Sequence, residues 1–464
     1  MSQQIPAEVE QKIDAMTEAF RRQLTELWHW IIDEEQELPA TAVNIEKKIR
    51  EWIRQIGADT QGLMLGQVER YRRKGKHACP ECNTEVYWTR YAERNYISTL
   101  GELTLERAYY HHGGCHTGWV PLDEQLQLGA SELSPLVQEM TSYLGAWMPF
   151  GQAVKYLAKY QGIHLSHDTV NTSTVTVGQA LQAQQAEAVR QAWEEQVVPE
   201  CEVTPPQRLY ISADGIHHLL PTGAGKEIKV AAIYETEERQ NKKGETEIHA
   251  VNIDYVVSAT GEDLGKAAYL RAVQRGVEYV DEIGVLGDGA NWIWNRVAAM
   301  FPPRKTTEIA DFYHASEYVW DAAKAVWGAE TAQTEAWSAQ QCHTLKHEGP
   351  QGVRQALQAL PMSKDHLPKA VTDARTYFDN QQTRMDYPQY VAHGWQIGSG
   401  SAESGVKQVV GVRLNQAGMR WNAEHAVEVA HVRAAILSER WDAFWTDFQP
   451  QARQYQRQAI AMAA

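Results

Sequence analysis

Apolar residues recur at intervals of three and four in two separate parts of the chain. Within residues 5–72, the segments 24–38 and 42–56 show this spacing, which is typical of amphipathic helices. A plain helical bundle or a dimerising hairpin accounts for this region. Residues 77–127 instead carry short alternating runs rich in Thr, Tyr and Val, which predict small antiparallel strands. Helical spacing returns over residues 131–195.

Part of this second helical region has the order of a helix-turn-helix. A helix predicted over 151–160 meets a short turn at 161–165, and Ser166 can cap a following helix. Any tight helical hairpin shares this order. The following helix has no Arg or Lys in its first two turns, which argues against a base-reading role.

Strand and helix patterns alternate from about residue 205. Three strands are predicted, from residue 208 to Asp214, over 226–238 and within 247–261, and they can pair as a meander. A fourth strand ends at Asp288 and a fifth lies within 306–314, each followed by a helix. Strands added through helical crossovers predict a layered α/β sheet.

Composition and charge narrow the possible functions. A chain of 464 residues is too long for one core, so we expect several domains. No window holds 18 apolar residues, and the N-terminus is polar, so we expect a cytoplasmic protein. The net charge of −15 argues against a nucleic-acid partner unless the basic residues are segregated, as they are in 69–76 and 404–420.

Three acids stand out in the α/β region. Asp214 and Asp288 end predicted strands, and Glu403 lies in the first turns of a helix that begins near Ser399. Such carboxylates could hold two divalent cations for phosphodiester exchange, and Mg²⁺ prefers oxygen ligands. The flanking glycines, Gly287 and Gly289, would leave room for a phosphate or a DNA strand.

Each acid also has an ordinary structural alternative. Asp288 alone is more readily explained as the N-cap of the next helix. Glu403 could form an i, i+4 pair with Lys407. The ordered set of three is therefore stronger evidence than any member.

Six short strings in order resemble a known family. They are SADG (212–215), KEIKV (226–230), GDGANWIW (287–294), DFYHA (311–315), GSGSAESGVK (398–407) and AGMRW (417–421). Together they resemble the DDE transposases of the ISKra insertion-sequence family, and the CPEC and VPLDEQL strings extend the likeness toward residue 78. The resemblance implies an RNase H-like catalytic domain in which Asp214, Asp288 and Glu403 bind Mg²⁺ or Mn²⁺.

The same resemblance bears on two further features. Asp311 and His314 form a D-x-x-H similar to that of the mutator and hAT superfamilies, which implies a catalytic role; a helix cap and a partly buried histidine are the alternative. Asp288 and Glu403 lie 115 residues apart, which predicts a helical insertion over 320–395. Its tryptophans could grip transposon ends, but packing in the insertion's own core is the favoured interpretation; they are Trp320, Trp327, Trp337 and Trp395.

The cysteines suggest a metal site rather than disulfides. There are five, at 79, 82, 115, 201 and 342, an odd and small number. Cys79 and Cys82 form a C-x-x-C, and His112 and Cys115 form an H-x-x-C about thirty residues later, a spacing that predicts a structural zinc ribbon. Members of the resembling family often carry Cys where His112 stands, so His111 and His116 are also candidate fourth ligands. Two reduced buried thiols are the alternative.

These observations predict a multidomain α+β DNA transposase, at least dimeric, that binds terminal inverted repeats, cleaves the ends and joins them to target DNA. A catalytically silent DNA-binding protein and a nuclease that cuts without joining are the alternatives. The resemblance also implies a bacterial cytoplasmic protein that is nucleoid-associated when bound. The predicted phosphate contacts are Arg72, Arg73, Lys74, Lys407, Arg413 and Arg420. The predicted domains are helical (1–72), zinc-ribbon-like (73–127), helix-turn-helix-like (128–200), RNase H-like (201–319 and 396–440), a helical insertion (320–395) and a helical tail (441–464).

Overall fold

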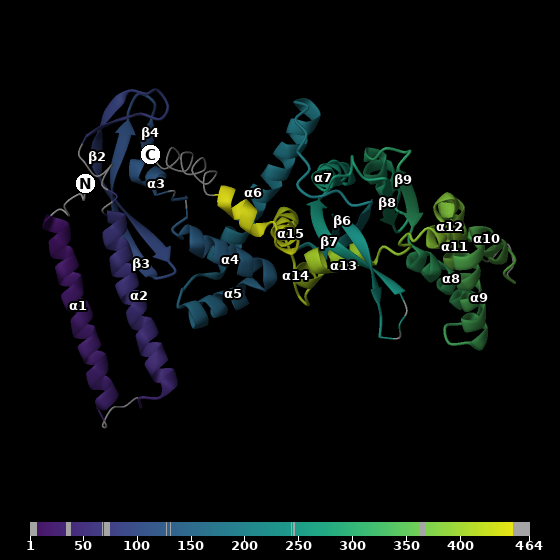
Figure 1. The fold of residues 1–464 in the computed structure, drawn as a ribbon, viewed down its shortest axis with the longest axis horizontal. Coiled ribbons are helices and arrows are strands. Elements are labelled where there is room, and N and C mark those ends of the chain that lie inside the picture. The colour runs from purple at the N-terminus through teal and green to yellow at the C-terminus, as the bar shows by residue number, and fades with distance from the viewer. Residues whose placement is uncertain are drawn as a thin grey trace. The chain divides into compact units, whose positions relative to one another are not determined.

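The computed structural model describes residues 7–33, 39–66, 68, 75–126, 128–129, 131–242, 244, 246–361 and 367–448. Its elements form two compact units (Figure 1). The first unit comprises Met1–Gly145, Phe150–Ser173 and Asp442–Ala464, and the second comprises Ala146–Pro149 and Thr174–Trp441. The chain is a mixed α+β, multidomain protein, as predicted. None of the helices in the described ranges combines the length and apolar character needed to cross a membrane.

The first unit begins with the two predicted helices, α1 (Ala7–Ile32) and α2 (Ala42–Gly66). Their apolar faces meet, with the rings of Phe20 and Trp52 5.0 Å apart between centroids. An antiparallel sheet follows in the order β1-β2-β3-β4, which confirms the predicted small strands. These strands are β1 (Lys76–Ala78), β2 (Glu85–Ser98), β3 (Gly101–His112) and β4 (Thr117–Trp119).

A buried charge cluster ties this sheet to α3 (Pro121–Gln125). Asp123 is 2% exposed and forms ion pairs with Arg94 of β2 and Arg107 of β3. Two arginines on one buried carboxylate compensate for the cost of removing its charge from water. The VPLDEQL string therefore has a structural role at the end of the small sheet.

The helical hairpin lies within about one residue of the predicted boundaries. After α4 (Pro135–Trp147), α5 (Phe150–Tyr156) continues as a π-helical turn (Leu157–Gln161), and α6 (His167–Glu194) follows. The Ser166 hydroxyl accepts a hydrogen bond from the Thr169 amide at 3.0 Å, which confirms the predicted cap. A role of this hairpin in binding DNA stays a prediction.

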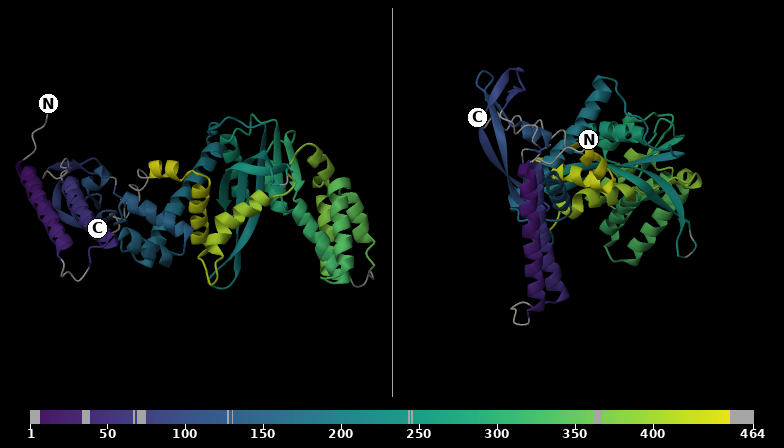
Figure 2. Two further views of the ribbon diagram at one scale, coloured as in Figure 1. Left: turned by 60° about the horizontal axis from the view of Figure 1, so that its bottom comes forward. Right: turned by 60° about the vertical axis from the view of Figure 1, so that its left-hand side comes forward.

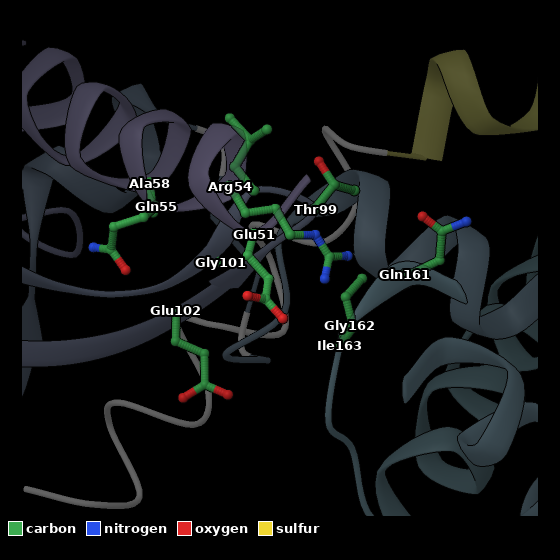
Figure 3. Close-up of a pocket in the computed structure, with 11 residues that line it drawn as sticks. Glu51, Arg54, Gln55, Ala58, Thr99, Gly101, Glu102, Gln161, Gly162 and Ile163 are labelled. Carbon is green, nitrogen blue, oxygen red and sulfur yellow. The ribbon is translucent and has the colours of Figure 1, made fainter. Parts of the chain in front are cut away.

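A pocket of about 340 Å³ lies where α2 meets this hairpin (Figure 3). The Arg54 side chain extends toward Gly162, which adopts a left-handed conformation with φ of +58°. Burial, and secondarily the charge of Arg50, lower the pKa of Arg54. Glu51 and Glu102 also line the pocket, so its charge is mixed and does not single out an anionic ligand.

The second unit contains a five-stranded sheet in the order β7-β6-β5-β8-β9. The strands are β5 (Arg208–Leu219), β6 (Gly225–Gln240), β7 (Thr246–Ser258), β8 (Glu282–Gly287) and β9 (Thr306–Ala310). The first three strands pair antiparallel, whereas β8 and β9 run parallel to β5. The predicted meander and crossovers are therefore confirmed.

One predicted strand boundary was wrong. β5 does not end at Asp214 but continues to Leu219, because its antiparallel pairing with β6 extends to the Leu219–Gly225 pair. Only the parallel pairing with β8 stops earlier, at Ser212. Asp214 therefore lies within a strand, just past the end of its pairing with β8.

Helices cover both faces of this sheet (Figures 1 and 2). On one face lie α7 (Gly261–Gln274), a π-helical segment (Ile293–Val297) and a 3-10 turn (Ala298–Met300). Their apolar residues form one buried core with Leu209, Ile211 and Ala213 of β5. On the other face lies α13 (Gly400–Val406), which contacts β5 and β6. Both faces of the sheet are therefore covered by helices of the second unit.

Between β9 and α13 the chain is helical, as predicted for the insertion. The helices are α8 (Phe312–Trp327), α9 (Ala332–Glu348), α10 (Pro350–Gln358), α11 (Lys369–Gln381) and α12 (Tyr387–Ala392), with a 3-10 turn at Gln382–Arg384. Beyond α13 come a π-helical turn (Lys407–Gly411), α14 (Val412–Leu414) and α15 (Ala423–Leu437).

Trp395 is buried, and the Arg208 guanidinium lies 4.0 Å from its ring centroid. The Trp327 and Trp337 rings contact each other at 5.6 Å. These contacts agree with a packing role for these three tryptophans.

Candidate functional site

Asp214 and Asp288 both lie just past the last pair between the neighbouring parallel strands β5 and β8. The last pair between β5 and β8 is Ser212 with Leu286, an offset of 74 positions. Two residues further along each strand direction, the same offset matches Asp214 with Asp288. Paired strands lie about 4.8 Å apart, so both aspartates follow neighbouring positions at the end of this pairing.

The face of the sheet to which Asp214 belongs follows from the alternation of side chains along β5. Side chains alternate between faces along a strand, and Ile211, Ala213 and Val285 point into the core that α7 covers. Asp214 therefore belongs to the opposite face, and Asp288 directly follows the end of β8. This second face carries polar groups at the carboxyl end of β8.

The helix of the third predicted acid packs on this same face. Ser212, Ala232 and Tyr255 are successive cross-strand partners and so share a face. Gly405 of α13 lies directly against the Tyr255 ring. The backbone of Glu403 is part of α13, whereas its side chain lies outside what the structure describes. The fold thus brings Asp214 and the helix of the third predicted acid to one side of the sheet, at the end where Asp288 follows β8.

The two aspartates also hold their own turns. One oxygen of Asp288 accepts a hydrogen bond from the Ala290 amide at 2.9 Å, which closes the turn before the next helix; because that helix begins at residue 291, Asp288 is not its N-cap. One oxygen of Asp214 accepts from the Gly215 amide at 2.6 Å. Both side chains are partly buried. These bonds fix the orientation of each carboxylate.

The predicted role of the flanking glycines was wrong. A Cβ at Gly287 would lie 2.6 Å from Cδ1 of Ile293, and a Cβ at Gly289 would lie 2.6 Å from Cε2 of Tyr377. The protein's own side chains therefore fill the space that we predicted for a phosphate or a DNA strand. Gly289 also has φ of +104°, a conformation that favours glycine.

Asp311 follows β9 and continues this row of aspartates. Gly287 pairs with Ala310, and the Asp311 amide donates to the Gly287 carbonyl at 2.8 Å, so Asp311 is level with Asp288. Its Oδ1 accepts hydrogen bonds from the Tyr313 and His314 amides at 2.6 and 2.9 Å. This geometry confirms the alternative interpretation of Asp311 as the cap of α8.

His314 lies on the first turn of α8, among aromatic rings. Its Nδ1 is 3.3 Å from a Glu317 carboxylate oxygen, and its ring is edge-on to Tyr318 and Tyr377. Tyr318 and Tyr377 stack with centroids 4.2 Å apart. A catalytic role for His314 stays a prediction.

Of the predicted phosphate contacts, one was wrong. Arg413 is 1% exposed, and its guanidinium lies 4.8 Å from the Trp421 ring centroid. Burial, together with the charge of Arg433, lowers the pKa of Arg413 to about 10. A cation enclosed in this way does not reach a DNA phosphate. Lys407 and Arg420 are exposed. Three further predicted contacts, Arg72, Arg73 and Lys74, lie outside the described residues.

Cys79, Cys82, His112 and Cys115 form a cluster in the first unit. Their ligand atoms all lie within 4.8 Å of one another. Two turns present them, and each turn ends in a left-handed residue directly after its second ligand, Asn83 with φ of 60° and His116 with φ of 52°. The Asn83 amide donates to the Cys79 carbonyl at 2.9 Å, which closes the first turn.

The surroundings of this cluster suit a metal ion. Cys79 is buried beside Tyr110 and Trp119, and Cys82 Sγ lies 3.4 Å from His112 Nδ1. Hydrogen bonds with Thr84 lower the pKa of the Cys82 thiol to about 6, and the neighbouring Cys82 raises that of Cys115 to about 11. Three sulfur atoms and one imidazole could hold a metal such as zinc. Of the three candidate histidines, the one that lies in this cluster is His112.

Sequence reasoning missed Ser399 and Tyr377. The Ser399 amide donates to Asp311 Oδ2 at 2.5 Å, and its hydroxyl donates to the same oxygen. Ser399 lies in the GSGSAESG string, and its place before a predicted helix was a signal for a cap. Tyr377 touches Gly289 from a helix far along the chain, and local sequence patterns carry no signal for such a contact.

The chain belongs to the uncharacterised protein family UPF0236, whose model matches residues 83–440. It is 30% identical over 158 residues to a protein of Streptococcus gallolyticus described as "UPF0236 protein in vanSb 3'region". That match covers 34% of this chain and 32% of the relative. The chain thus matches about a third of the length of this relative. The family match includes the sheet, its aspartates and α13, but starts after Cys79 and Cys82.

Proposed function

We propose that this chain is a DNA transposase with an RNase H-like catalytic domain in its second unit. The single observation that carries the proposal is that Asp214 and Asp288 each lie two residues past the last pair between the neighbouring parallel strands β5 and β8. The helix that contains Glu403 packs on the face to which Asp214 belongs. The strand order β7-β6-β5-β8-β9 agrees with the layout that the resemblance to DDE transposases implies.

The donor set fits magnesium or manganese. Asp214 and Asp288 offer carboxylate oxygens, which these cations prefer, and each carboxylate is held by a backbone amide at 2.6 and 2.9 Å respectively. Two such ions, when bound, would activate a water or a 3′-hydroxyl and stabilise the leaving oxygen of a phosphodiester. The protein's part is to hold the carboxylates in place and to align the DNA.

Other parts of the chain would grip the DNA. Lys407 and Arg420 are exposed beyond α13 and would contact phosphates. The metal cluster of the first unit and the hairpin of α5 and α6 would bind the terminal inverted repeats. Two ends must be paired for joining, so the active form would be at least a dimer.

The test uses the full-length protein and a linear duplex that carries the ends of the element, with Mg²⁺ or Mn²⁺. We expect cleavage at the ends followed by joining to target DNA. Asp214→Asn and Asp288→Asn should each abolish both steps, because they remove carboxylate charge at the proposed cation site. Asp281→Asn serves as a matched control, since Asp281 is exposed and precedes β8 at the other end of the strand.

Each alternative function has its own outcome. Cleavage without joined products would identify a nuclease. Binding of the end duplex without any cleavage would identify a catalytically silent DNA-binding protein. Identical activity of wild type and Asp288→Asn would refute the proposed catalytic site.

A further inference from the structure

The Asp311 carboxylate is fully engaged within the protein. It is 5% exposed. Its Oδ1 accepts from two amides at the start of α8, and its Oδ2 accepts from the amide and the hydroxyl of Ser399. An ionised carboxylate has about four lone-pair sites. These four bonds use that capacity, so a cation would have to displace one of them.

A second contact holds the same two segments together. The Phe312 amide donates to the Ile397 carbonyl at 2.9 Å. A Cβ at Gly398 would lie 2.6 Å from Cε2 of Tyr313, so the chain passes close to the first turn of α8. Residues 397–399 are therefore fixed to the N-terminus of α8 by hydrogen bonds on both sides of Gly398.

This attachment lies next to the helix of the third acid. Ser399 directly precedes α13, and Glu403 comes four residues later, about one helical turn. Residues four apart lie on the same side of a helix. The attachment therefore sets where the backbone of Glu403 lies relative to the strand end that precedes Asp288.

We propose that Asp311 is a positioning residue that fixes the start of α13 next to the Asp288 strand, and not a metal ligand. The inference rests on the proposed function, because it assigns Asp311 a task within that same site. Holding the two halves of the site in place before a cation arrives avoids reorganisation at the moment of binding. The aspartate of the D-x-x-H string would then help to assemble the acidic site by holding the start of α13.

Two measurements on the full-length protein test this proposal. The first is amide hydrogen exchange over residues 397–406, which needs no activity. Ser399→Ala removes one of the four bonds and should raise exchange there about five- to tenfold, as expected for one lost hydrogen bond. Asp311→Asn should raise it further, and Ser399→Thr, which keeps the hydroxyl, should restore it.

The second measurement is the affinity for Mn²⁺ alone by calorimetry. A positioning role predicts that Ser399→Ala and Asp311→Asn both weaken Mn²⁺ binding, in the same order as their effects on exchange. A ligand role predicts that Asp311→Asn abolishes binding while Ser399→Ala leaves it unchanged, and this result would overturn the proposal.

A matched control separates this attachment from helix capping in general. Thr331 caps α9 through its hydroxyl, which accepts from the Thr334 amide at 3.1 Å. Thr331→Ala should leave exchange over 397–406 and Mn²⁺ binding unchanged. Unchanged exchange in both the Asp311 and Ser399 variants would also overturn the proposal. A wild type that neither binds Mn²⁺ nor cleaves DNA would instead refute the proposed function, while exchange still decides whether Asp311 holds α13.

Discussion

The ring of Tyr377 lies against Gly289, the residue that follows Asp288. A Cβ at position 289 would be 2.6 Å from Tyr377 Cε2, and the Gln381 side-chain amide donates to the Gly289 carbonyl at 2.9 Å. Tyr377 and Gln381 both belong to α11 of the helical insertion. The insertion therefore packs directly on the corner that carries Asp288, and the geometry of this corner depends on it.

Substitution of Gly289 should destabilise the second unit. Gly289→Ala adds a left-handed non-glycine residue at φ of +104° and a clash with the Tyr377 ring. The conformation costs about 1–2 kcal/mol and overpacking adds about 1–3 kcal/mol. The free energy of unfolding measured in urea should fall by the sum of these two costs. Gly223→Ala is the control, because Gly223 has φ of +86° with nothing within 4 Å and should show the conformational cost only. Equal costs for the two variants would contradict the role of the ring contact.

Removal of the Tyr377 hydroxyl should not destabilise the protein, in contrast to substitution of Gly289. This atom is buried and has no hydrogen-bond partner among the described residues. An unpaired buried hydroxyl costs about 1–3 kcal/mol, so Tyr377→Phe should leave stability unchanged or raise it by about 1 kcal/mol. Tyr387→Phe is the matched control, because the Tyr387 hydroxyl donates to the Ala310 carbonyl at 2.8 Å. The control should lose about 1 kcal/mol in the same urea titration. A clear loss of stability in Tyr377→Phe would mean that its hydroxyl has a partner.

The cysteine cluster predicts bound metal in the purified protein. We expect about one zinc ion per chain by elemental analysis, held by the three thiolates and His112. Cys82→Ser should lower the zinc content and destabilise the first unit, because metal binding contributes directly to folding. Cys201→Ser should not, since Cys201 lies outside the cluster. Full-length protein without zinc, or equal zinc in both variants, would refute this assignment.

Features that depend on local spacing were predicted well. The metal cluster follows from two pairs of ligands at short intervals, which the same two turns present in the structure. The sheet of the second unit follows from runs of apolar residues, which must be buried wherever they pair. The carboxyl end of β8 was predicted to within one residue, because the apolar run stops at Gly287, directly before Asp288.

Features that depend on distant contacts were not predicted. β5 extends past Asp214 because β6 continues to pair with it, although the sequence there becomes rich in histidine. Arg413 is buried on Trp421, and no pattern of charges distinguishes such an arginine from an exposed one. The bond between Asp311 and Ser399 spans 88 positions, so only the fold reveals it.

The exposed cations beyond α13 should set the salt dependence of DNA binding. Lys407→Ala and Arg420→Ala each remove a proposed phosphate contact and should reduce the slope of log K against log salt by about 0.9. Fluorescence anisotropy with the end duplex measures this slope. Arg413→Met should instead lower the urea midpoint without a specific change in slope, because Arg413 is buried. An Arg413 variant that folds normally but shows the reduced slope would contradict its structural role.

Buried His431 should make stability depend on pH. It lies on α15 and is 6% exposed; burial, and secondarily the charge of Arg440, lower its pKa to about 4. The unfolded chain binds this proton near pH 6.5, so in the window from 6.5 down to 4 the unfolded state holds more protons and stability falls as pH falls. The loss due to His431 between pH 7 and pH 5 should be about 2 kcal/mol.

Urea titrations at pH 7 and pH 5 test this expectation. His431→Gln removes the titrating group, so its loss of stability between the two pH values should be smaller than that of wild type by about 2 kcal/mol. His425→Gln is the matched control on the same helix, where His425 is only partly buried, and it should keep most of the wild-type dependence. Because wild type and His431→Gln share every other titrating group, the difference between these two isolates His431. Equal pH dependence in wild type and His431→Gln would show that the buried imidazole does not control acid stability.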